Sequence, residues 1–61
     1  MGMMMTKAQE ILSQIASDGQ KRRWAEGNAV SVDQDSQRNT TVYRYSDGSE
    51  IKCVGPRLEA A

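Results

Sequence analysis

The stretch Val42-Tyr43-Arg44-Tyr45-Ser46-Asp47-Gly48-Ser49-Glu50-Ile51 decides the fold, because it places a turn signal between two strand-like segments. Residues 40–45 and 50–54 are rich in β-branched and aromatic side chains, which favour strands. Asp-Gly between two such segments is typical of a tight turn. The segment therefore predicts a β-hairpin.

Two registers fit this hairpin. A two-residue loop would pair Arg44 with Ile51, whereas a three-residue loop with Gly48 in the left-handed conformation would pair Arg44 with Glu50 and Tyr43 with Ile51. We favour the second register, because it sets opposite charges side by side. It also sends one set of side chains to a common face of the sheet: Thr41, Tyr43, Tyr45, Ile51 and Cys53.

An amphipathic helix is predicted before the hairpin, from Lys7 to about Asp18. Thr6 and Gln9 have the spacing of a capping box, and Gly19 is a plausible end. Apolar residues recur at three-and-four spacing and form one stripe along this helix: Ala8, Ile11, Leu12 and Ile15.

The region between helix and hairpin allows two interpretations. Trp24 follows Ile15 by nine residues, so a continuous helix would place it half a turn away from the apolar stripe. We therefore favour a strand over 22–25, while a long or kinked helix through Trp24 stays open. Residues 29–32 alternate apolar and polar, as a short strand does, and the polar residues 33–39 predict a loop.

These segments predict an α+β fold in a single domain covering residues 1–61. One N-terminal helix packs on a three- or four-stranded antiparallel meander, which has a solvated face and two edges. Gly55-Pro56 ends the last strand, and residues 55–61 are expected to be a tail.

The composition predicts a thin core. Only nine of the 61 residues are Ile, Leu or Val, and a chain of this length buries about 60% of its unfolded surface. One Cys and no His exclude an internal disulfide and a zinc tetrad, so we expect no metal and no cofactor. A second chain is the remaining source of stability. A homodimer or an obligate binding partner is favoured, and a homodimer would form through the helix stripe or an open sheet edge.

The sequence argues against catalysis and against a membrane. Without His, the usual group for acid–base catalysis near neutral pH is missing, and Cys53 lies mid-strand with no His partner. The glycines are too widely spaced for a phosphate-binding loop. No apolar run approaches the roughly 18 residues of a membrane span, and no signal peptide is recognised. A lone Cys then favours the cytoplasm.

One cationic cluster offers a nucleic-acid site. Lys21, Arg22 and Arg23 precede Trp24, so cations could contact phosphates while the indole stacks on a base. The formal net charge of zero argues against this, because nucleic-acid-binding domains usually carry a basic excess. We prefer Trp24 in a core or at a protein interface.

Protein binding is the function the residues favour most. Tyr43, Arg44 and Tyr45 lie together on one strand, and with Trp24 they are of the types that dominate interface energetics. The competing interpretation is that the two Tyr cover the sheet face under the helix. These four residues are our predicted partner contacts.

The layout resembles small phage-encoded proteins that bind and block a host protein, anti-CRISPR proteins among them. The resemblance lies in size and architecture, in the helix from Thr6 to Ile15 and the hairpin from Val42 to Ile51. It implies a non-enzymatic inhibitor of a larger bacterial host protein, acting in the host cytoplasm. The alternatives are a small nucleic-acid-binding regulator and a structural subunit of a larger assembly.

Overall fold

The hairpin forms in the favoured register. In the computed structural model, which describes residues 4–60, β2 (Thr40–Arg44) pairs with β3 (Glu50–Val54), and Arg44 lies opposite Glu50. The Gly48 N–H donates to the Tyr45 carbonyl and the Tyr45 N–H to the Ser49 carbonyl, both at 3.0 Å. Gly48 has a φ of +87°, which a residue with a Cβ adopts only under strain. The three-residue loop is thus confirmed.

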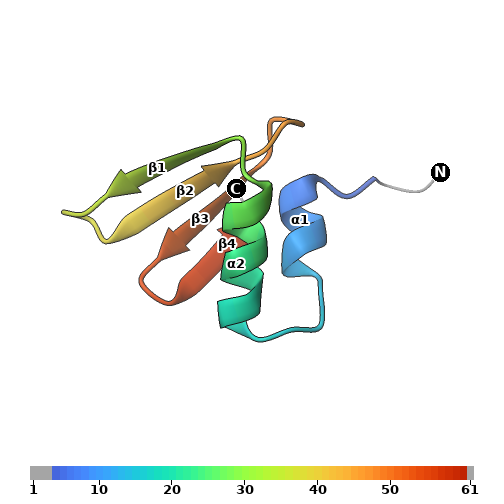
Figure 1. Cartoon of the computed structure of the whole chain (residues 1–61), viewed down its shortest axis with the longest axis horizontal. Helices are drawn as coiled ribbons and strands as arrows, with labels where there is room; N and C mark the ends of the chain where they lie inside the picture. Colours follow the sequence, from blue (N-terminus) through green and yellow to red (C-terminus); the bar gives the residue numbers. More distant parts are fainter. Residues whose placement is uncertain (1–3, 61) are drawn as a thin grey trace.

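A strand is added on each side of this hairpin. The sheet has the order β1-β2-β3-β4, all antiparallel, with β1 at Ser31–Asp35 and β4 at Arg57–Ala60 (Figure 1). The predicted α+β meander is therefore confirmed. The predicted tail is wrong over residues 57–60. Gly55, with a φ of +57°, and Pro56 form a two-residue turn that returns the chain to the sheet.

Two helices precede the sheet instead of one. α1 covers Lys7–Leu12 and α2 covers Asp18–Asn28, so the helix predicted over 7–18 is too long and the strand predicted over 22–25 is wrong. α1 begins with the predicted capping box, in which Thr6 and Gln9 bond reciprocally. Ser17 is the N-cap of α2, and its hydroxyl accepts the Gln20 N–H. Gly19 therefore lies inside the first turn of α2.

Both helices lie on one face of the sheet and the core lies between the layers (Figure 1). The sheet presents the predicted face, and Tyr43, Ile51 and Cys53 on it are buried with Ala8 of α1 and Ala25 of α2. The Tyr45 hydroxyl donates a hydrogen bond of 2.9 Å to the Ala25 carbonyl. Among residues 4–60, Ile51 is the one large side chain that is fully buried, so the core is thin as expected.

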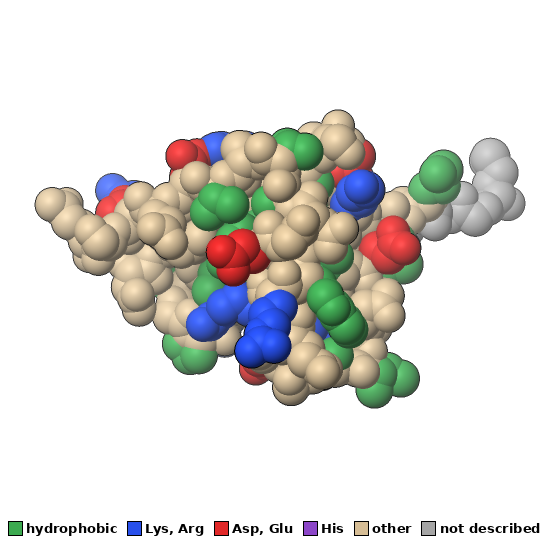
Figure 2. Space-filling model, in the orientation of Figure 1, with side chains coloured by type: hydrophobic (Ala, Val, Ile, Leu, Met, Phe, Trp, Pro, Cys, Tyr) green, Lys and Arg blue, Asp and Glu red, His purple; other side chains and the backbone are tan. Residues whose placement is uncertain are grey.

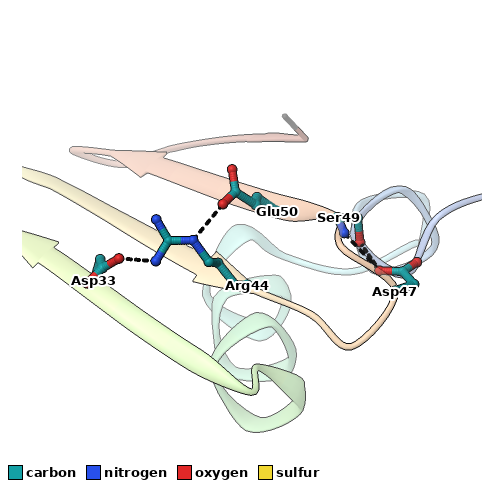
Figure 3. Close-up of polar contacts among 5 residues, drawn as sticks. All are labelled: Asp33, Arg44, Asp47, Ser49 and Glu50. Carbon is teal, nitrogen blue, oxygen red and sulfur yellow. Dashed lines mark hydrogen bonds and ion pairs between the residues drawn. The ribbon is translucent and has the colours of Figure 1, made fainter.

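The hairpin turn is also attached to the start of α1. Asp47 accepts the Lys7 N–H at 2.8 Å, and its other carboxylate oxygen accepts the Ser49 N–H and hydroxyl (Figure 3). The Ser49 hydroxyl in turn accepts the Ala8 N–H at 3.2 Å. N–H groups in the first turn of a helix have no partner within the helix, so the turn supplies part of the α1 cap.

Candidate interaction surfaces

Two of the predicted partner contacts are core residues. Tyr43 and Tyr45 are buried, because the helices cover the sheet face on which both side chains stand. Burial raises the pKa of both phenols, that of Tyr45 to about 12. A partner of the folded chain does not reach these two side chains, so the interpretation that they cover the sheet under the helices is the correct one.

Arg44 stands on the opposite, solvent-facing side of the sheet. Its guanidinium lies between Asp33 of β1 and Glu50 of β3, and it donates to both carboxylates (Figure 3). The hydrogen bonds to Asp33 and then to Glu50 raise the pKa of Arg44. Arg44 thus joins three strands, and its guanidinium is held by two carboxylates of the same chain.

The other charged side chains of this outer face also lie beside opposite charges. Lys52 lies directly opposite Glu59 in the register of β3 and β4, and Arg57 lies 3.7 Å from the Glu59 carboxylate. Opposite charges on neighbouring strands stabilise each other and leave little net field. The outer face is therefore a solvated surface with balanced charge.

Trp24 lies apart from these residues, in an open groove between the two helices. Its side chain is 40% exposed, although the next residue, Ala25, is completely buried. The groove has a volume of about 390 Å³ and is lined from both helices by Lys7, Glu10, Ile11, Gln14, Trp24 and Asn28. An exposed indole beside a second apolar side chain is a typical contact site for another protein.

The predicted cationic cluster is divided by the helix. Successive side chains on a helix point about 100° apart, so Lys21, Arg22 and Arg23 face three directions instead of alternating between two faces as on a strand. Arg22 donates to the Gly55 carbonyl at 3.1 Å, and Lys21 is half-buried on the side of Ala25. Figure 2 shows Lys and Arg side chains over the lower part of α2, with carboxylates and apolar groups nearby.

The apolar stripe predicted as a dimer contact is used inside the chain. Ala8 is fully buried, and Ile11 and Leu12 are half-buried against the core. Ile15 is fully exposed, because α1 ends at Leu12 and the helical spacing ends with it. The stripe therefore provides no continuous surface for a second copy.

An open edge strand is the surface that sequence reasoning did not locate. All five residues of β1 are exposed, and Val32 is 44% exposed although it stands on the helix side of the sheet. The sequence contained a signal for it, since Val30 and Val32 alternate with polar residues next to a polar loop. The strand was nevertheless predicted two residues too early and too short.

The other features give no further site. Within residues 4–60, no group of three or more Cys, Asp or Glu side chains could hold a metal ion. No helix in that part of the chain is both long enough and apolar enough to cross a membrane. Comparisons with protein-family models, with curated proteins and with solved structures find no match to this chain.

Proposed function

We propose that this chain is a non-enzymatic protein-binding module whose partner contact is the groove between α1 and α2. The observation that carries the proposal is the exposure of the only Trp of the chain in that groove. An exposed Trp contributes little to a core that is already thin, whereas exposed aromatic side chains are typical of binding surfaces.

The lining of the groove indicates what it binds. Trp24 and Ile11 provide the apolar part, and Lys7 and Glu10 add one charge of each sign. An apolar side chain of the partner would enter between Trp24 and Ile11, while polar groups beside it pair with the two charges. Such rim charges set orientation more than affinity.

The partner in this proposal is a larger bacterial host protein, and the chain acts as its inhibitor or modulator in the host cytoplasm. Occupying a surface requires no catalytic group, which suits a chain without His. The resemblance in size and architecture to phage-encoded host inhibitors supports the same function.

Capture from a bacterial lysate tests this, with immobilised wild type, Trp24→Ala and Val54→Ala compared. Val54 is the control, because it is 39% exposed, much like Trp24, but lies on the outer face of the sheet, away from the groove. We expect a defined protein that wild type and Val54→Ala retain and Trp24→Ala loses, with circular dichroism showing that all three are folded.

Two results would count against the proposal. If Trp24→Ala retains the same protein as strongly as wild type, the groove is not the contact. If the retained material is nucleic acid, released steeply by salt and lost in a Lys21, Arg22 and Arg23 triple Ala variant, the nucleic-acid alternative holds instead.

A further inference from the structure

The free edge of β1 exposes a defined set of backbone groups. In an antiparallel sheet successive residues bond to opposite neighbours. The backbone N–H of Tyr45 donates to Ser49 on the β3 side, so the backbone groups of Arg44 point towards β1. The Arg44 carbonyl indeed accepts the Val30 N–H at 2.8 Å. Ser31 lies opposite Arg44, so its backbone groups point towards β2. Because the direction alternates along β1, the N–H and C=O of Val32 and Gln34 point away from the sheet.

The charges on this edge are compensated within the chain. Asp33 is paired with Arg44, and Asp35 lies 3.7 Å from Arg38. Natural proteins often protect an open edge with unpaired charge, which repels a second strand. Here that protection is weakened, and Val30 and Val32 remain exposed beside the open backbone.

We propose that β1 pairs with β1 of a second copy of this chain, antiparallel and centred on Val32. In this register Val32 lies opposite Val32 of the second copy, and Asp33 lies opposite Ser31. The avoidance of like charges selects it, because centring on Asp33 would oppose two Asp33 carboxylates, and centring on Gln34 would oppose Asp33 and Asp35. Centring on Ser31 would pair Val32 only with Val30, whose N–H Arg44 already holds, whereas centring on Val32 pairs the two free Val32 backbones with each other.

The pairing makes one continuous sheet of eight strands from two copies of the four-stranded sheet. The two-fold axis is perpendicular to the sheet, so the helices of both copies lie on the same side. Figure 1 shows β1 at the edge of the sheet, extending away from the helices, so the second copy meets no helix there. The Val30 and Val32 side chains of both copies then form one apolar strip. The short edge makes the dimer weak and concentration-dependent.

Sedimentation equilibrium of the purified chain over a range of concentrations tests the register. Wild type should rise from 6.8 kDa towards twice that mass. Val32→Lys places two ammonium groups opposite each other and should weaken association at least about tenfold. Val32→Glu should do the same, while an equimolar mixture of the two variants should regain the doubled mass. Val54→Lys, a matched exposed position on the outer face, should dimerise like wild type.

Three results would overturn the proposal: wild type that stays at 6.8 kDa at every concentration, Val32→Lys that associates like wild type, or a mixture that stays monomeric. Circular dichroism of each variant separates loss of association from loss of folding. The groove at Trp24 takes no part in this contact. Failure here would therefore leave the proposed function intact, and failure of the capture experiment would leave the dimer intact.

Discussion

At the residue scale, the Asp47 side chain connects two elements that lie far apart in the sequence. It accepts hydrogen bonds from Lys7 at the start of α1 and from Ser49 across the hairpin turn. These bonds, the Ser49 hydroxyl first, lower the pKa of Asp47 from 3.8 to about 2. One exposed carboxylate thus joins the turn to the first helix.

Because of Asp47, we expect the free energy of unfolding to depend on pH below about pH 4. A carboxylate whose pKa is lower in the folded state contributes stability above its unfolded pKa, and this contribution is lost as the pH falls through the folded value. For Asp47 the loss runs from about pH 4 to about pH 2. We expect Asp47→Asn to be less stable than wild type above this range and to approach it near pH 2.

Thermal unfolding followed by circular dichroism from pH 2 to pH 6 checks this. Asp33→Asn serves as the control, because it also removes an exposed carboxylate, one that pairs with Arg44, but leaves the α1 cap intact. If the difference between Asp47→Asn and wild type stayed constant over the whole range, the carboxylate would have no role as an ionised cap.

At the element scale, the local rules of turns and caps were more informative than long-range periodicity. The register of β2 and β3 is predictable because the Asp-Gly turn leaves two registers and the pairing of Arg44 with Glu50 selects one of them. α2 was missed because the phase of Trp24 was measured from Ile15, as if one helix ran through both. Ser17 and Gln20 have capping-box spacing and indicate a second start, but the helix predicted over 7–18 includes Ser17 in its last turn.

The site was less predictable than the fold, because it depends on tertiary packing and not on local rules. Whether an aromatic residue is core or contact depends on which face the helices cover, and this follows from packing. Tyr43 and Tyr45 are of a type common at interfaces, yet α1 and α2 cover them. Trp24 is exposed, as a contact residue must be, but the groove that surrounds it exists only because α1 ends at Leu12 and α2 returns beside it.

Two glycines should respond in opposite ways to a methyl group. Gly27 lies in α2 with no atom within 4 Å of the added Cβ, so Gly27→Ala should stabilise the fold by roughly 0.5–1 kcal/mol. Gly48 has a φ of +87°, so Gly48→Ala should destabilise it by about 1–2 kcal/mol. Urea unfolding of the two variants and wild type measures both. Equal signs would contradict the element assignments, since the opposite responses depend on a helix at Gly27 and a left-handed turn at Gly48.

At the scale of the whole molecule, a small core leaves apolar side chains exposed at two separate open surfaces. Six apolar residues are buried within residues 4–60, whereas Trp24, Val30 and Val32 are among those exposed. Trp24 lies in the helix groove and Val30 and Val32 lie beside the β1 edge, so the two surfaces are separate. This separation allows both proposed contacts, one for a partner and one for a second copy, to exist on the same chain.

The central claim, that Trp24 is a partner contact, is tested most directly by following Trp24 itself. The chain has a single Trp, so protein labelled with 5-fluorotryptophan gives one fluorine resonance to assign. On titration with the partner identified by capture, we predict that this resonance shifts and loses its solvent isotope effect as the indole becomes buried. An unchanged resonance and isotope effect at saturating partner would contradict the account.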